Sequence, residues 1–194
     1  NEKTAMEEAL GASFAGKRAL VCMKHVGMNV CADPFMGSAM TGAGGGLVIA
    51  ACDDPSMHSS QNEQDSRFYA NFALIPCMEP SNQQEAYEAT RYAFDLSEQF
   101  RIPVMMRLTT RMAHSRANVA PRAPKKQNEL SFPDKEHERQ WVTLPAIARR
   151  RYPQLIKDNL EFEKAAETSP FNKYINGKDK SLGIIACGLG YNYL

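Results

Sequence analysis

The sequence predicts an α/β fold in which a parallel sheet carries helices on both faces. Apolar, strand-like runs alternate along the chain with helical patterns of about 10 to 20 residues, which is the order that right-handed βαβ units produce. One run, GGLVIAAC at 45–52, is apolar throughout, as expected of a strand buried on both faces of a parallel sheet. The 194 residues, 43% of them hydrophobic, suit a globular domain of ordinary size.

The first part of the chain supplies two helices and two strands. Residues 3–16 are predicted to form a helix whose small residues recur at helical spacing, so its backbone can lie close to a sheet. The strand RALVCMK follows at 18–24. A second helix is expected over residues 30–41, with Pro34 in its first turn, where proline is tolerated. It leads into the strand at 45–52.

A long polar loop and a capped helix come next. The loop, from Asp53 to Arg67, is expected to end in a short helix around 65–72, and the strand-like ALIPCM follows. Ser81 is predicted as the N-cap of the clearest helix, with Gln84 three residues on to complete a capping box. The core face of this helix recurs every three or four positions: Ala86, Ala89, Ala93, Leu96 and Phe100.

The pattern weakens after the strand PVMMRLTT at 103–110. Residues 117–140 are rich in proline and charge, which is typical of a linker or surface excursion. Residues 141–169 are predicted to be a helical surface cover with a break near Pro153. A last strand-like run, LGIIAC at 182–187, precedes a glycine-rich turn, and we expect the chain to be a piece of a longer protein.

Composition argues against several partners. Lys and Arg number 23 against 22 for Asp and Glu, so the chain lacks the positive excess that releases counterions from a nucleic acid. No apolar run approaches the ~18 residues of a membrane span, and the N-terminus lacks the layout of a signal peptide. The five cysteines are scattered singly without a CxxC pair, which is typical of a reduced, cytoplasmic protein. We therefore expect no nucleic acid and no membrane partner.

Polar residues gather where three predicted strands end. Lys24 and His25 follow the first strand, the 53–67 loop follows the second, and Arg111 and His114 follow the strand at 103–110. The carboxyl ends of parallel strands share one edge of a sheet, and ligands bind at that edge in open α/β folds. The sequence therefore predicts a binding cleft built from these three segments, with solvated loops as the alternative.

Other motifs point less clearly to a site. The glycines of TGAGGGL at 41–47 precede a strand, whereas phosphate-binding fingerprints place them between a strand and the following helix. No GxSxG elbow supports a serine hydrolase. Metal binding by His58, Glu63 and Asp65 stays open, although their spacing matches no known ligand pattern.

Four segments carry a family signal: NEKTAMEEALGASFAG, RALVCMKHVGMNVCADP, GGLVIAACDDPSMHSSQNEQDSR and PVMMRLTTRMAHSR. Together they resemble the alpha subunits of indolepyruvate ferredoxin oxidoreductases. The similarity is nearly continuous from Asn1 to about Ala117 and weaker beyond. The resemblance implies a thiamine-diphosphate pyrimidine-binding (Pyr) domain at 1–117, a linker with covering helices at 118–180, and the truncated start of a next domain at 181–194.

The family's chemistry is the oxidative decarboxylation of aryl-pyruvates to aryl-acetyl-CoA. The resemblance implies thiamine diphosphate with Mg²⁺, [4Fe-4S] clusters and coenzyme A, with the Mg²⁺ ligands and the clusters outside this chain. It also implies a beta subunit, ferredoxin and a small 2-oxoacid as partners, in a hetero-oligomer or dimer of heterodimers. With half of the thiamine site on another domain, the piece alone is expected to be inactive.

The resemblance also implies roles for individual residues. The glutamate that binds N1′ of the aminopyrimidine corresponds to Glu2, although a first-turn glutamate also compensates a helix dipole. His25, Val26 and Gly27 align with the family's loop beside the cofactor, where Gly27 suits close backbone approach. No metal ligand is implied within the chain. The residues expected near the substrate or coenzyme A are Lys24, His58, Gln61, Asn62, Arg111 and His114.

Two alternatives to an indolepyruvate oxidoreductase remain. A sister enzyme acting on pyruvate or 2-oxoglutarate would differ in the side-chain pocket, whose shape the sequence does not define. A non-catalytic α/β assembly module would keep the fold without the activity.

Overall fold

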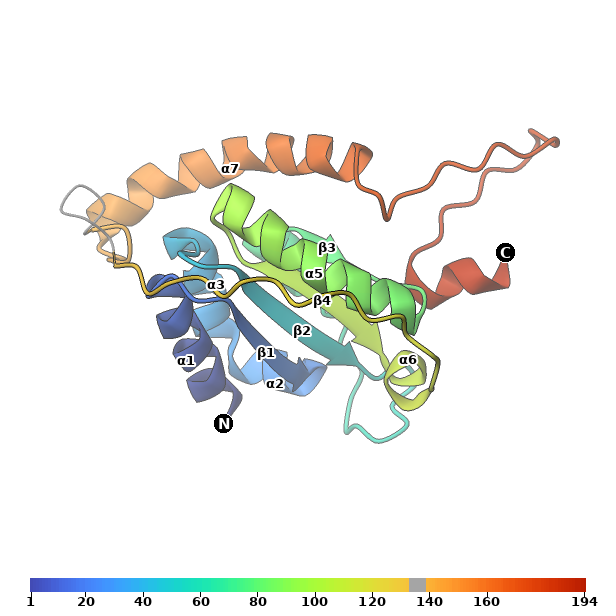
Figure 1. The fold of residues 1–194 in the computed structure, drawn as a ribbon, viewed down its shortest axis with the longest axis horizontal. Coiled ribbons are helices and arrows are strands. Elements are labelled where there is room, and N and C mark those ends of the chain that lie inside the picture. The colour runs from blue at the N-terminus through green and yellow to red at the C-terminus, as the bar shows by residue number, and fades with distance from the viewer. Residues whose placement is uncertain (133–138) are drawn as a thin grey trace.

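A computed structural model describes residues 1–132 and 139–194, whose strands form one parallel sheet in the order β1-β2-β4-β3 (Figure 1). Helices cover both faces of this sheet, so the predicted α/β fold class is confirmed. In chain order the elements are α1 (Glu2–Phe14), β1 (Ala19–Lys24), α2 (His25–Val30), α3 (Ala32–Thr41), β2 (Leu47–Asp53), α4 (Arg67–Ala73), β3 (Cys77–Met78), α5 (Gln83–Phe100), β4 (Val104–Thr109), α6 (Thr110–His114), α7 (Pro145–Glu167) and the 3₁₀ helix η1 (Gly188–Tyr193).

Strand β2 lies at the centre of the core, because its alternate side chains enter two different apolar clusters. Leu47 and Ile49 are fully buried among side chains of α1 to α4 on one face. Val48 points to the opposite face, where Ala89 and Ala93 of α5 cover it. The near-continuous apolar sequence of β2 is therefore a direct consequence of burial on both faces.

The glycines that precede β2 allow two backbones to pack closely. A Cβ added to Gly44 would lie 2.4 Å from the carbonyl oxygen of Ser13, and one on Gly45 would lie 2.4 Å from that of Lys17. The buried Ser13 hydroxyl donates to the Gly45 carbonyl (2.6 Å) and accepts from the Gly44 N–H (3.2 Å). The glycine run thus allows the end of α1 to pack against the start of β2. This packing explains why glycines occur here, so no nucleotide-binding role is needed to explain them.

The N-cap of α5 differs by one residue from the prediction. The Asn82 side chain accepts from the Glu85 N–H (2.9 Å), so Asn82 rather than Ser81 caps the helix. The Glu85 carboxylate in turn accepts from the N–H and hydroxyl of Ser81, both at 2.5 Å. Glu85 therefore takes the part predicted for Gln84, because a carboxylate is the stronger acceptor for two donors.

Helix α7 runs through Pro153, so the predicted break is wrong. Proline removes one backbone hydrogen bond, and the carbonyl four residues earlier belongs to Arg149, which is exposed and accessible to water. Only Leu155 and Phe162 of this helix are buried, as expected of a surface cover. Residues 182–187 form no strand either: Ile185 is 97% exposed, and among residues 1–132 and 139–194 no strand pairs with it.

Candidate functional site

The carboxyl ends of β1, β2 and β4 lie side by side at one edge of the sheet (Figure 1). Lys24 at the end of β1 is opposite Cys52, and Asp53 at the end of β2 is opposite Thr109 at the end of β4. The polar segments that follow these strands therefore start from adjacent positions. The predicted convergence of the three segments is confirmed.

Glu2 lies against Gly27, although 25 positions separate them in the sequence. A Cβ added to Gly27 would be 2.6 Å from Glu2 Cγ and 3.3 Å from its carboxyl carbon. Burial raises the pKa of the Cys31 thiol to about 11, and the negative charge of Glu2 adds to that rise. Within the described residues, the half-buried Glu2 carboxylate accepts no hydrogen bond. It is therefore available to a donor from outside this part of the chain.

The segment of His25, Val26 and Gly27 forms the first turn of α2 rather than a loop. No side chain caps this helix, so the sequence lacked the signal that would have predicted its start. The His25 ring is fully buried, and its Nε2 lies 3.0 Å from the carbonyl oxygen of Asn62. Since a carbonyl only accepts, Nε2 is the donor, and Nδ1 has no partner among the described residues.

The loop after β2 is organised by Asp54, which is 2% exposed. Its carboxylate accepts from the backbone N–H groups of His58 (3.2 Å) and Ser59 (2.8 Å). It also accepts from the hydroxyls of Ser60 (2.8 Å) and Thr110 (2.6 Å). These bonds, that of Thr110 first, hold the pKa of Asp54 well below its usual range, so the group stays ionised.

A buried ion network lies beneath the same loop. Arg107 Nε donates to Asp53 Oδ2 (2.5 Å), and another nitrogen of its guanidinium donates to Glu79 Oε1 (2.6 Å). Asp53 also accepts from the N–H and hydroxyl of Ser66, at 3.0 and 2.5 Å. The network joins β2, β4 and the segment leading into α4. Sequence patterns did not predict this network, although an arginine inside the apolar run VMMRLTT was the available signal.

The residues expected to meet substrate or coenzyme A are mostly exposed. Lys24 Nζ lies 3.4 Å from both the carbonyl and the hydroxyl oxygen of Ser59. Arg111 is engaged by Tyr193, whose hydroxyl accepts from the guanidinium and whose ring centroid lies 5.8 Å from Arg111 Cζ. The side chains that remain open to solvent on this edge are His58, Gln61, Asn62 and His114.

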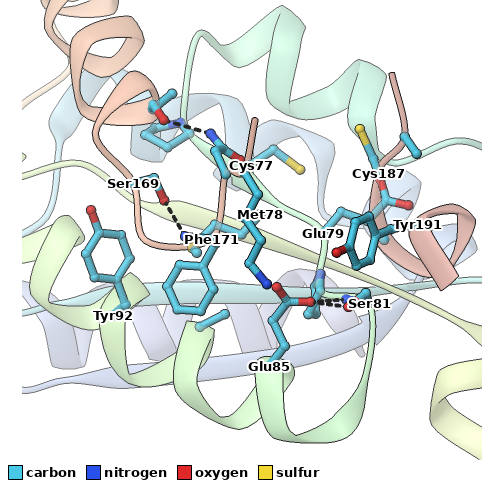
Figure 2. A pocket seen from close by; sticks show the side chains of 18 of the residues that line it. Cys77, Met78, Glu79, Ser81, Glu85, Tyr92, Ser169, Phe171, Cys187 and Tyr191 are labelled. Atoms are coloured by element: carbon cyan, nitrogen blue, oxygen red, sulfur yellow. Dashed lines mark hydrogen bonds between the residues drawn. The ribbon is translucent and has the colours of Figure 1, made fainter. Parts of the chain in front are cut away.

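A large cavity lies elsewhere, beside β3 and between α5 and the segments after α7 (Figure 2). It measures about 900 Å³, and its lining includes Arg67 at the end of the 53–67 loop but none of the individual residues predicted to contact cofactor, substrate or coenzyme A. Tyr92 and Phe171, with ring centroids 5.5 Å apart, form part of its mainly apolar wall. This cavity is therefore not the cleft that the sequence predicts at the ends of β1, β2 and β4.

Two negative findings concern metals and membranes. Nowhere in residues 1–132 and 139–194 do three His, Cys, Asp or Glu side chains gather as metal ligands would, so the alternative of a metal held by His58, Glu63 and Asp65 gains no support. In the same two ranges, no helix has the length and apolar character needed to cross a membrane.

Comparison with known proteins identifies relatives along the whole chain. Residues 1–169 match the family described as "Pyruvate flavodoxin/ferredoxin oxidoreductase, thiamine diP-bdg". Curated proteins named indolepyruvate oxidoreductase subunit IorA are 45% identical in Methanothermobacter marburgensis, 46% in Archaeoglobus fulgidus and 44% in Pyrococcus horikoshii. Each alignment covers 100% of this chain and 31% of the relative, so the chain spans about a third of their length.

A transketolase structure from Pichia stipitis is 15% identical over 84% of this chain and 27% of its own, with a TM-score of 0.42. A structural likeness at that level supports no conclusion about fold or function.

Proposed function

The chain belongs to the thiamine-diphosphate-binding family of the pyruvate flavodoxin/ferredoxin oxidoreductases, and from that premise we propose that it forms the pyrimidine-binding part of the thiamine site in an indolepyruvate oxidoreductase. The name shared by the curated relatives, at 43–46% identity over the whole chain, favours this enzyme over sister enzymes for pyruvate or 2-oxoglutarate.

The proposed reaction converts an aryl-pyruvate and coenzyme A into aryl-acetyl-CoA and CO₂. Two electrons leave the substrate and pass through [4Fe-4S] clusters to ferredoxin. Thiamine diphosphate, when bound with Mg²⁺, supplies the electron sink that receives the charge left as CO₂ departs. The clusters, the Mg²⁺ ligands, the beta subunit and the diphosphate-binding domain are proposed to lie outside this chain.

The position of Glu2 is the observation that carries the proposal. The N1′ nitrogen of an aminopyrimidine needs a carboxyl group that can share a proton with it, and the Glu2 carboxylate is half-buried and accepts no hydrogen bond from the described chain. Gly27 beside it leaves room for the Glu2 side chain, because it has no side chain of its own. The residues present therefore fit the cofactor. In this proposal Glu2 binds the aminopyrimidine ring and shares its proton, and α2 lies beneath the ring.

The decisive variant is Glu2→Gln in the full-length, assembled enzyme. An amide cannot exchange the proton, so we expect aryl-pyruvate oxidation to fall by about 100-fold or more, with an unchanged circular dichroism spectrum. Glu7→Gln is the matched control, because Glu7 lies on the same helix and only approaches Lys3 at 3.9 Å. Activity of Glu2→Gln within a few fold of wild type would contradict the assignment.

Substrate choice is tested with a panel of 2-oxoacids and ferredoxin as acceptor. We expect indolepyruvate, phenylpyruvate or hydroxyphenylpyruvate to be oxidised with a higher kcat/KM than pyruvate or 2-oxoglutarate. The 194-residue chain assayed alone is expected to show no turnover, because the proposed site is incomplete without the other domain. Preference for pyruvate would contradict the aryl-pyruvate proposal, while leaving the family membership intact.

A further inference from the structure

The Asp54 carboxylate joins two separate segments at the edge of the sheet. Three of its four donors belong to the loop, namely the N–H groups of His58 and Ser59 and the hydroxyl of Ser60. The fourth is the hydroxyl of Thr110, the first residue of α6. Both oxygens are used, since Oδ1 accepts from His58 and Thr110 while Oδ2 accepts from Ser59 and Ser60.

The loop also contains backbone that needs to be held in place. Ser56 and Met57 are two consecutive non-glycine residues with positive φ, at 67° and 53°. Side chains make this conformation unfavourable, so it persists only where surrounding contacts determine it. Asp54 provides one such contact through its own carbonyl, which accepts from the Met57 N–H at 2.9 Å.

The side chains displayed by the two segments share one chemistry. His58, Gln61 and Asn62 lie on the loop, and α6 carries Arg111 and His114. All of them offer N–H donors, and several are cationic or become so on protonation, which suits an anionic carboxylate. Their relative positions depend on how the loop and α6 are joined.

We propose that Asp54 is a positioning residue, which locks the 54–62 loop and α6 into one wall that receives the carboxylate of the 2-oxoacid substrate. The identity of the bound carboxylate rests on the proposed function. The locking itself follows from the four hydrogen bonds and the strained turn. Asp54 is inaccessible to substrate in this arrangement, because its carboxylate is buried and fully occupied by protein donors.

The test uses Thr110→Val and Thr110→Ser in the assembled enzyme, with Asp54→Asn as the stronger change. Valine keeps the volume of threonine and removes the hydroxyl that reaches Asp54, whereas serine keeps the hydroxyl. We expect Thr110→Val and Asp54→Asn to raise KM for the aryl-pyruvate about tenfold, with kcat within about threefold. The thiamine diphosphate concentration that gives half-saturation should not change in Thr110→Val or Asp54→Asn. Thr110→Ser should have the wild-type KM for the aryl-pyruvate.

Hydrogen exchange supplies a second readout that needs no turnover. The amides of His58 and Ser59 donate to Asp54, so they should exchange about tenfold faster in Asp54→Asn. Glu63→Gln is the matched control, because glutamine keeps an acceptor for the Ser56 N–H, which lies 3.1 Å from Glu63 Oε2 in the wild type. In this variant the amides of His58 and Ser59 should exchange at the wild-type rate.

The outcomes separate the two proposals. Unchanged exchange at His58 and Ser59 in Asp54→Asn overturns the positioning role. An equal loss of 2-oxoacid and thiamine binding in Thr110→Val also overturns it, because that result indicates general disruption. A wild-type enzyme without 2-oxoacid turnover refutes the proposed function, and the exchange measurement then still decides whether Asp54 fixes the loop.

Discussion

At the scale of single residues, Glu2 packs over Gly27 in the candidate cofactor site. Gly27 lies inside a helix, where alanine would be more favourable by up to about 1 kcal/mol. A Cβ at this position would nevertheless lie 2.6 Å from Glu2 Cγ, which is too close for a non-bonded contact between two carbon atoms. Glycine at this position therefore serves the placement of Glu2 rather than the stability of α2.

This explanation predicts the behaviour of Gly27→Ala. The nearest atom, Glu2 Cγ, belongs to a side chain that can move, and Met23 Cβ at 3.1 Å needs to shift by only a few tenths of an ångström. The fold should therefore persist, with an unfolding free energy within about 1 kcal/mol of wild type. Displacement of Glu2 should raise half-saturation by thiamine diphosphate about tenfold in the assembled enzyme. Gly37→Ala in α3 is the control, since no atom lies within 4 Å of its added Cβ. Equal cofactor binding by both variants would contradict the explanation.

At the scale of elements, the ion network fixes the strand ends to one another and to the loop. Arg107 is 7% exposed and Asp53 1%, so neither charge is solvated by water. Glu79 follows β3 and bonds the other end of the same guanidinium, which connects three neighbouring strands of the sheet. The free-energy cost of burying each of these charges is offset by the opposite charges that it contacts.

Removal of Arg107 should therefore be costly. Arg107→Met leaves the Asp53 carboxylate buried without its cation and leaves Glu79 with Arg67, whose nearest nitrogen lies 3.6 Å from Glu79 Oε2, so we expect the unfolding free energy to fall by about 3–5 kcal/mol. Urea unfolding of the chain measures this change. Arg122→Met is the comparison, because Arg122 pairs with Glu88 in an exposed position and should cost less than about 1 kcal/mol. Similar losses for both variants would show that burial does not set the cost.

At the scale of the whole molecule, ionised carboxylates hold distant segments together. The pKa of Asp54 is lowered chiefly by the Thr110 hydroxyl, that of Asp65 by its bond from Arg67, and that of Glu98 by its bond from Arg18. Glu98 also accepts from Asn128, in the irregular segment that follows α6. Protonation of these groups should loosen the loop and this segment together.

The direction of these shifts predicts acid sensitivity. A carboxylate whose pKa is lower in the folded state contributes its full stability above its unfolded pKa, which is about 4, and loses it as pH falls. We expect the unfolding free energy of the chain to be nearly constant above about pH 5 and to decrease steadily below about pH 4. Asp54→Asn should be less stable at pH 7 but lose less on acidification. Constant stability down to pH 3 would contradict the prediction.

Local sequence patterns were sufficient where a local interaction sets the structure. The apolar run of β2 and the spacing of Ala89, Ala93 and Leu96 gave the central strand and the buried face of α5. Local patterns did not predict α2, because this helix starts without a capping side chain. They also predicted a break at Pro153, but α7 continues through this residue because water can bind the backbone carbonyl that the proline leaves without a donor. Patterns therefore predict elements best where burial is continuous.

By itself the sequence determined the α/β class, the order of the main strands and helices, the meeting of three polar segments at one edge, and the family to which the chain belongs. Only the tertiary structure decided that Glu2 lies on Gly27, that Arg107 neutralises Asp53, and that Asp54 joins its loop to Thr110. The physical reason is the separation of these partners, which is 54 positions for Arg107 and Asp53 and 56 for Thr110 and Asp54. Periodicity and capping record what a segment buries and where it ends, whereas a contact between distant side chains exists only once the sheet has set its strands in register.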